Sequence, residues 1–128
     1  MTETVVALSG GVGGAKLVLG LSHAMRASDL IVACNTGDDF DHLGLRICPD
    51  IDSVLYALAN LSDSVRGWGR RDESWVFMEA LASMGGPDWF NLGDRDLATH
   101  VLRSQMLRSG MSLSEVTRAL TQRLGIET

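Results

Sequence analysis

Glycines and a single lysine follow the first apolar segment of the chain, in an arrangement that favours phosphate binding. Residues 9–17 read SGGVGGAKL, and Lys16 is the only lysine in the sequence. Glycine lets the backbone approach an anion closely, and the start of a helix carries partial positive charge. We predict that Gly10, Gly11, Gly13 and Gly14, with Lys16 in the first helical turn, bind a phosphate group. The spacing fits neither a dinucleotide fingerprint nor a P-loop, so the alternative is a strand-to-helix turn that binds nothing.

Aspartates are concentrated further along the chain. Five of them lie close together in sequence, with Arg46 as the one Lys or Arg among them: Asp38, Asp39, Asp41, Asp50 and Asp52. Carboxylates this close repel one another unless a cation neutralises them, and Mg²⁺ binds one or two carboxylates together with phosphate oxygens. Asp38 and Asp39 are therefore the candidate metal ligands, the alternative being a solvated acidic loop. Asp50 either belongs to this acidic site or caps the next helix, for which it is a good residue type. Asp52 lies in that helix's first turn, where the helix dipole alone also explains an acid.

Two later segments carry further polar candidates. Residues 63–72, DSVRGWGRRD, combine three arginines with Trp68. Such a loop either stacks on or pairs with an anionic ligand, or is a solvated surface loop. Asp72 is expected to cap a helix that continues to Met84. His100 lies in a later helical segment, where a histidine with satisfied hydrogen bonds is a more common finding than a catalytic one.

The elements that would position these residues are those of an α/β protein. Val5–Leu8 and Leu30–Cys34 are short apolar runs typical of buried strands, and residues 17–25 between them have the period of an amphipathic helix. Together they predict a right-handed βαβ unit. Its glycine segment and acidic segment then emerge at the same edge of a parallel sheet, where ligands bind. Leu43–Cys48 is expected to be a short third strand.

The rest of the chain has helical periodicity. Apolar stripes, capping signals and glycines predict helices within residues 49–61, 72–84, 92–110 and 112–125. The third of these helices is expected to turn Leu97, Val101 and Leu102 toward the core, and SLSE at 112–115 is a capping box for the fourth. We therefore predict an α/β fold with a Rossmann-like parallel sheet, incomplete at two to three strands, and a helical second half.

Composition restricts the function further. The net charge is −5 and apolar residues make up 45% of the chain, which argues against binding to nucleic acid or to an anionic membrane. No apolar run is long enough to span a bilayer, and the first residues do not begin a signal peptide. We expect a cytoplasmic protein of one domain. Cys34 and Cys48 are too few for a cysteine zinc site and are expected to be small buried thiols.

Five segments together resemble those of the 2-phospho-L-lactate transferases, and they occur in the same order. They are SGGVGGAK (9–16), NTGDD (35–39), CPDID (48–52), RGWGRRDE (66–73) and LGDRDLATH (92–100). The similarity covers essentially the whole chain, whereas members of that family are considerably longer. The resemblance implies that residues 1–128 are the N-terminal portion of a Rossmann-like transferase, with a βαβ phosphate-binding part at 1–49 and a helical part at 50–128.

The same resemblance implies a reaction in coenzyme F-420 biosynthesis. These enzymes join a deazaflavin, Fo, to a phosphorylated three-carbon acid that is delivered as a GTP-derived guanosine diphosphate adduct. A primary hydroxyl of Fo attacks the distal phosphorus, GMP leaves, and Mg²⁺ is required. The resemblance does not distinguish lactate, enolpyruvate and a glycerate analogue as the three-carbon acid.

Individual roles follow from the matching positions. The glycines of residues 10–14 and Lys16 would hold the diphosphate. Asp52 would contact the deazaflavin, and a carboxylate there is a candidate general base. Asn91, which precedes the LGDRD segment, would also contact the deazaflavin. Asp38 and Asp39 would bind Mg²⁺.

Two other classes of function stay open. Relatives that share the glycine segment bind nucleotide-sugars and regulate metabolism or cell-wall growth without catalysis, and an inactive binding fragment is the third interpretation. The CPDID and LGDRDLATH segments favour the transferase. A parallel sheet of two or three strands leaves an unpaired edge. We therefore expect the chain to be inactive alone and to associate with itself or with a missing C-terminal segment, unless residues 43–48 close that edge.

Overall fold

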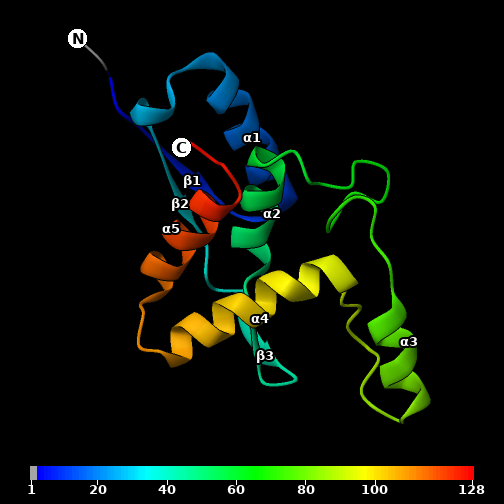
Figure 1. Cartoon of the computed structure of the whole chain (residues 1–128). Coiled ribbons are helices and arrows are strands. Elements are labelled where there is room, and N and C mark those ends of the chain that lie inside the picture. Colours follow the sequence, from blue (N-terminus) through cyan, green and yellow to red (C-terminus); the bar gives the residue numbers. More distant parts are fainter. Residues whose placement is uncertain (1–2) are drawn as a thin grey trace.

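The computed structural model describes residues 3–128, which form four strands and five α-helices (Figure 1). In chain order these are β1 (Val5–Ser9), α1 (Gly11–Ala24), β2 (Leu30–Cys34), β3 (Phe40–His42), β4 (Leu45–Ile47), α2 (Pro49–Leu58), α3 (Val76–Ser83), α4 (Asp94–Arg108) and α5 (Leu113–Arg123). No helix within these residues has the length and apolar character needed to cross a membrane.

β1, α1 and β2 form the predicted βαβ unit. The two strands are parallel, with a register that runs from Val5 opposite Leu30 to Ser9 opposite Cys34. α1 and α2 pack against each other on one face of this sheet, where Val18 and Val54 belong to the first buried core. A two-stranded parallel sheet accompanied by helices confirms the α/β class and is compatible with an incomplete Rossmann-like fold.

The predicted third strand within residues 43–48 is present as β4, but it does not join the parallel sheet. β4 instead pairs antiparallel with β3 in a separate two-stranded sheet. Leu43 and Gly44 connect the two strands with φ angles of 54° and 74°, the left-handed backbone that a two-residue hairpin turn requires. The chain therefore folds back on itself before α2, and the outer edge of β2 stays unpaired within the described residues.

α2 connects the first core to a second one. Its Val54 belongs to the first core, whereas its Ile51 packs with Met106 of α4 and Val116 of α5 in the second. The predicted capping box at residues 112–115 is present at the start of α5. α2 thus joins the parallel sheet to the C-terminal helices α4 and α5.

α4 buries a polar side, contrary to the prediction for its apolar residues. Val101 and Leu102 are 44% and 37% exposed, and of the three predicted residues Leu97 alone packs against a buried cluster. The buried residues of α4 are instead mainly polar: Thr99, His100, Arg103, Ser104 and Met106. Their partners come from other elements; for example, the Arg46 N–H of β4 donates to Ser104 Oγ at 2.8 Å. The period of apolar residues does not predict the orientation of such a helix, because its buried side is held mainly by hydrogen bonds and not by apolar packing.

The starts of α3 and α4 cap each other: a carboxylate near the start of each helix accepts hydrogen bonds from N–H groups in the first turn of the other. The predicted cap, Asp72, does not serve α3. Asp94, the first residue of α4, accepts hydrogen bonds from the first two N–H groups of α3, each at 3.0 Å. In return Glu73, which precedes α3, accepts from two N–H groups in the first turn of α4 at 2.7 and 3.1 Å. This crossed pair of caps fixes α3, at the periphery of the molecule (Figure 1), to the start of α4.

The second face of the parallel sheet is open. Val6, Leu8 and Ile31 point away from α1 and α2 and are 57%, 79% and 52% exposed. Among residues 3–128, nothing pairs with the outer edge of β1 or of β2. The sheet is therefore covered on one side only.

Candidate functional site

A cavity of about 840 Å³ lies between α1, α2, the segment 60–72 and the start of α4. Three predicted site residues line it: Lys16 of α1, Asp52 of α2 and Asn91 just before α4. Asp96 and His100 of α4 line it as well. Residues that are far apart in sequence, and that were singled out for phosphate and deazaflavin binding, thus share one cavity.

The four glycines meet different demands. α1 already begins at Gly11, where φ is 70° and glycine is strongly preferred. A Cβ at Gly14 would lie 2.5 Å from Ser9 Oγ, so this glycine lets α1 approach β1. A Cβ at Gly10 would make an ordinary contact of 3.7 Å with Asn35, and a Cβ at Gly13 would meet nothing within 4 Å. Neither turn geometry nor packing accounts for Gly13.

Lys16 lies in the second turn of α1 and not in the first, because the helix starts within the glycine segment. Its side chain is exposed and lines the cavity. None of the ion pairs within residues 3–128 includes it. Its ammonium group is therefore available to an anion bound in the cavity.

Asp50 joins the glycine segment to the segment after β2. The N-cap of α2 is Cys48, so the prediction that Asp50 caps this helix is wrong. The buried carboxylate of Asp50 instead accepts the Gly11 N–H at 2.9 Å and the Asn35 side-chain amide at 2.8 Å. The first N–H of α1 is therefore already hydrogen-bonded. The N–H groups of residues 12 and 13 have no carbonyl partner within the helix, so they are the next donors that a bound anion would meet.

The candidate metal ligands follow β2, near the glycine segment. Asp38 is exposed, and its Oδ2 lies 3.4 Å from the side-chain amide of Asn35. Both carboxylate oxygens of Asp39 are buried without a hydrogen-bond partner among residues 3–128. An unpaired buried carboxylate is costly, and hard oxygen donors of this kind are those that Mg²⁺ prefers. Asp39 therefore fits a magnesium ligand.

The cysteines are free thiols. Cys48 is fully buried, as predicted, and burial raises its pKa to about 12, with Arg103 opposing the rise and the neighbouring Asp39 carboxylate adding to it. Cys34 is partly buried, and burial raises the pKa of its thiol as well. Both thiols therefore stay protonated near neutral pH.

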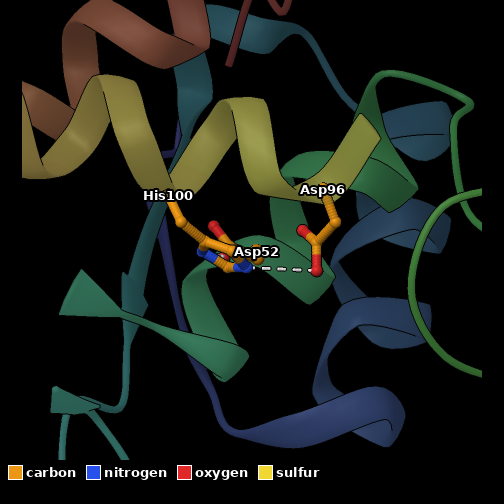
Figure 2. A group of neighbouring side chains, drawn as sticks. All are labelled: Asp52, Asp96 and His100. Carbon is orange, nitrogen blue, oxygen red and sulfur yellow. Dashed lines mark ion pairs between the residues drawn. The ribbon is translucent and has the colours of Figure 1, made fainter. Parts of the chain in front are cut away.

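Three side chains from α2 and α4 lie close together (Figure 2) and line the cavity: Asp52, Asp96 and His100. Arg103 is fully buried and donates through its two terminal nitrogens to the two oxygens of Asp52. The Nδ1 atom of His100 lies 3.6 Å from Asp52 Oδ2. Asp52, one turn into α2, is therefore held by α4 and is not merely a partner of the helix dipole.

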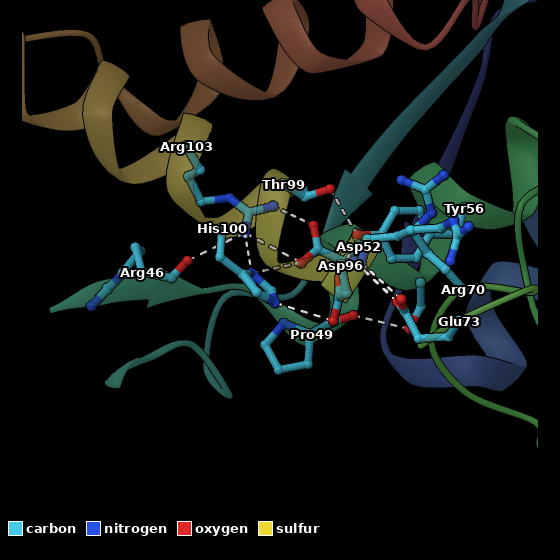
Figure 3. A network of polar contacts seen from close by, with 12 residues as sticks. Arg46, Pro49, Asp52, Tyr56, Arg70, Glu73, Asp96, Thr99, His100 and Arg103 are labelled. Carbon is cyan, nitrogen blue, oxygen red and sulfur yellow. Dashed lines mark hydrogen bonds and ion pairs between the residues drawn. The ribbon is translucent and has the colours of Figure 1, made fainter. Parts of the chain in front are cut away.

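Asp96 completes the cluster on the side of the cavity (Figure 3). His100 Nε2 lies 3.1 Å from Asp96 Oδ2. The Tyr56 hydroxyl donates to Asp96 Oδ1 and lies 2.8 Å from Thr99 Oγ1. The side chain of Asp96 is 18% exposed, against 7% for Asp52. Asp96 is thus the carboxylate of the cluster with more access to the cavity.

Burial is the largest influence on the ionisation of this cluster. It raises the pKa of Asp52, with Arg103 opposing the rise. Burial also acts to raise the pKa of Asp96, but His100 and Tyr56 stabilise that carboxylate more, so its pKa is lowered. Burial and the nearby carboxylates raise the pKa of Tyr56, which therefore stays a hydrogen-bond donor. The surroundings favour the ionised form of Asp96.

The same three residues also have the spacing of metal ligands. Asp52, Asp96 and His100 each offer an atom within 4.8 Å of the others. Arg103, however, already binds both oxygens of Asp52, and its positive charge disfavours a second cation there. We interpret the cluster as a hydrogen-bonding centre.

Sequence reasoning missed Arg103, Tyr56 and Asp96 as members of the site. A signal was present: residues 96, 99, 100 and 103 are all polar and have the spacing of one helical face. The prediction oriented α4 by its apolar residues, whereas the side of the helix that is buried is mainly polar.

The segment 63–72 is more ordered than a solvated loop. Ser62 and Arg70 form an isolated antiparallel bridge. The Arg66 guanidinium lies 4.3 Å from the ring centre of Trp68 and 5.2 Å from that of Trp75. A second hollow of about 540 Å³ lies against these side chains and Asn91. Arg66 is thus used within the protein, while ligand stacking stays a prediction for Trp68, which lines both hollows.

Comparison with known proteins gives consistent matches. The family model described as 2-phospho-L-lactate transferase CofD matches residues 5–128. A phosphoenolpyruvate transferase of Streptomyces avermitilis is 50% identical over 120 residues, and one of Kitasatospora aureofaciens is 51% identical over 121. One of Mycobacterium sp. (strain KMS) is 50% identical over 133 residues. Each match covers 93% of this chain but 38%, 38% and 40% of the three relatives, so the chain spans about two fifths of their length.

Proposed function

The chain belongs to the 2-phospho-L-lactate transferase CofD family, and on this premise we propose that it binds the phosphate and acceptor groups of a magnesium-dependent phosphotransfer reaction. In this reaction the deazaflavin Fo receives a phosphorylated three-carbon acid from a guanosine diphosphate adduct, and GMP is released. The observation that carries the proposal is the cavity that Lys16, Asn91 and the buried Asp52 cluster share. Because the chain spans about two fifths of its relatives' length, the proposal assigns it part of the complete site.

The names of the relatives favour one of the candidate three-carbon acids. The relatives are phosphoenolpyruvate transferases, which favours an enolpyruvyl group over a lactyl or glyceryl group for this chain. Identity near 50% across 93% of the chain supports the same substrate class. We therefore propose as the donor a guanosine diphosphate whose distal phosphate carries an enolpyruvyl group.

The residues of the chain would contribute mainly by positioning and charge. The N–H groups at the start of α1 and the ammonium of Lys16 would bind the diphosphate. The hydroxyl oxygen of Fo would form a bond to the distal phosphorus while its proton passes to a carboxylate that lines the cavity. The bond from that phosphorus to the GMP oxygen would break, and its electron pair would leave with GMP. A cavity lined by Lys16, Asp52 and Asn91 would hold acceptor and phosphate side by side and make this step effectively intramolecular.

Asp39, with Asp38 beside it, would hold the Mg²⁺ ion. When bound, such an ion neutralises charge on the phosphate oxygens. The support for this assignment is the pair of Asp39 oxygens that are buried without a hydrogen bond among residues 3–128. Asp50 and Asn35 keep this segment beside the glycine segment through their hydrogen bond.

Ligand binding by the 128-residue chain tests the proposal. We expect Fo to bind, as followed by its fluorescence, and GDP with Mg²⁺ to raise the melting temperature. Lys16→Ala should weaken GDP binding by about 1–3 kcal/mol, the contribution of one charge-assisted contact. Arg123→Ala removes an exposed cation at the end of α5 and should leave GDP binding unchanged.

The opposite ligand preference would contradict the proposal. Stabilisation by UDP-sugars, without binding of Fo, would favour the nucleotide-sugar-binding regulators as the functional class. Binding of neither ligand would leave the inactive fragment as the interpretation.

A further inference from the structure

Two carboxylates that line the cavity, those of Asp52 and Asp96, differ in how readily a ligand can hydrogen-bond to them. Both oxygens of Asp52 accept from Arg103. In Asp96, Oδ1 accepts from Tyr56, while Oδ2 faces His100 Nε2 at 3.1 Å. That contact is an ion-pair distance without hydrogen-bond alignment, since Nε2 has no hydrogen-bond partner among residues 3–128. A carboxylate has about four acceptor positions, so both keep some free. Those of Asp96 are the more accessible to a ligand in the cavity, because its side chain is 18% exposed against 7% for Asp52.

His100 gives an independent indication of a ligand. Its side chain is 2% exposed and lines the cavity. Buried polar atoms nearly always have a hydrogen-bond partner, and the Nε2 atom of His100 has none within the described chain. A hydroxyl oxygen beside this pair, within hydrogen-bond distance of both atoms, would donate to Asp96 Oδ2 and accept from the N–H of the imidazole.

The charges around Asp96 favour a neutral donor group there. Arg103 compensates Asp52, which leaves Asp96 with His100 as its nearest partner. Two further charged groups lie close to Asp96: Arg70, which lies over the Tyr56 ring at 5.5 Å, and Glu73, which accepts the Asp96 N–H. The charged side chains elsewhere in the cavity lining are Lys16, Asp63, Arg71 and Asp72. An anionic ligand group would meet two carboxylates, whereas a hydroxyl would form a charge-assisted hydrogen bond.

We propose that Asp96, together with His100, binds the primary hydroxyl group of the acceptor, which is its terminal hydroxyl. This assignment rests on the proposed function and deepens it, because that hydroxyl is the group that must reach the phosphorus. Asp52, for which the sequence predicted the acceptor contact, then acts with Arg103 as a positioning residue that holds His100. Lys16, the proposed ligand of the diphosphate, lines the same cavity. The phosphate and the hydroxyl would therefore bind next to each other.

The test combines two ligands with two protein variants. Binding of Fo and of an analogue that lacks only the terminal hydroxyl is measured by fluorescence titration. The parent chain should bind Fo about 10- to 100-fold more tightly than the analogue, the range expected for one hydrogen bond to a charged group. In Asp96→Ala and Asp96→Asn this ratio should fall toward one through loss of Fo affinity, with analogue affinity unchanged. Asp41→Asn, the same change on an exposed hairpin residue, should keep the ratio.

Each outcome decides something different. A parent chain that binds both ligands equally overturns the hydroxyl assignment without any variant, so a variant that fails to fold does not block the test. An unchanged ratio in folded Asp96 variants also overturns it, while Fo binding itself still supports the proposed function. If neither ligand binds the parent chain, the proposed function fails and the inference fails with it.

Discussion

Gly13 and Gly14 are neighbours in the sequence but meet different constraints. A Cβ at Gly14 would collide with Ser9, whereas a Cβ at Gly13 would stand in open space. In a helix, glycine is less stable than alanine by about 0.5–1 kcal/mol. A glycine with free space around it therefore costs stability without a gain in packing, which is expected where a ligand approaches the backbone.

Exchanging each glycine for alanine should separate these roles. Gly13→Ala should raise the free energy of unfolding by about 0.5–1 kcal/mol and weaken GDP binding. Gly14→Ala should lower the free energy of unfolding by about 1–3 kcal/mol through overpacking. Urea unfolding and calorimetric titration with GDP measure both effects. A Gly13→Ala chain that is more stable and binds GDP as tightly as the parent would show that the glycine is not needed for the ligand.

Asp39 provides a test for the cation. Its charge is buried without a hydrogen bond within the described residues, so Asp39→Asn should raise the melting temperature in EDTA, where no divalent ion compensates the parent. Mg²⁺ should raise the melting temperature of the parent and of Asp41→Asn, but not that of Asp39→Asn. An equal response of Asp39→Asn to Mg²⁺ would place the ion elsewhere.

Asp52 and Arg103 are expected to depend on each other for stability. Removing one partner leaves the other charge buried and uncompensated, which typically lowers the free energy of unfolding by about 3–5 kcal/mol. We expect a loss of this size in Arg103→Met. The double variant Asp52→Leu/Arg103→Met should recover most of it, because apolar pairs of similar volume tolerate such sites. Additive losses in denaturant unfolding would mean that the two side chains contribute independently.

Single residues were predictable where local chemistry determined them. The glycine segment and Lys16 lie between β1 and the first two turns of α1, so their position at the end of a strand was predictable from the local sequence pattern. The partners of Asp50 and Asp52 did not follow, because they come from Gly11, Asn35 and Arg103, which only the tertiary fold brings near. The site roles of these residues stay predictions.

At the level of elements, α3 is attached through its first turn. Asp94 of α4 accepts the first N–H groups of α3 and the Ser74 hydroxyl. These hydrogen bonds, led by that of Ser74, lower the pKa of Asp94 below its usual value of 3.8. The cap stabilises the fold while Asp94 is ionised, since the capped helix start favours negative charge.

The pH dependence of stability should reflect this cap. Because the folded pKa of Asp94 is lower than the unfolded one, its contribution is complete above pH 3.8 and is lost as the pH falls through the folded pKa. Asp94→Asn should therefore be less stable than the parent at pH 7, and the difference should shrink below about pH 4. Denaturant unfolding between pH 7 and pH 3 measures it, with Asp41→Asn as a control. A difference that is constant with pH would exclude the charge as its cause.

Elements with local signals were predicted and those fixed by distant partners were not. β1, β2, α2 and α5 follow from apolar runs, a proline and a capping box, and the structure confirms them. The hairpin of β3 and β4 was missed because Leu43 at φ 54° is an uncommon turn residue. The orientation of α4 was wrong because its buried side is polar.

The whole molecule presents one uncovered apolar face. Val6, Leu8 and Ile31 lie on the side of the sheet opposite α1 and α2, and parallel sheets are normally covered on both faces. The relatives are longer than this chain, which spans 38% of the Streptomyces avermitilis protein. The segment outside the match is the partner that we expect on this face.

Co-expression with that segment of the Streptomyces avermitilis relative should give a stable complex. The expected partner adds strands to the open edges and covers Leu8. Leu8→Lys should therefore abolish the complex in sedimentation velocity. Leu17→Lys introduces the same charge at a residue of α1 with 57% exposure and should leave the complex intact. A chain that remains monomeric with the segment present would contradict this prediction.

α2 belongs to both cores, which has a consequence for how the molecule opens. Its Val54 packs with the sheet and α1, and its Ile51 with α4 and α5, while Asp50 holds the start of α1. Neither half can detach without exposing one side of this helix. The slowest amide protons of α1 and of α5 should therefore exchange with deuterium at a common rate. A nucleotide bound at the start of α1 should slow that exchange in α5 as well, across the width of the molecule.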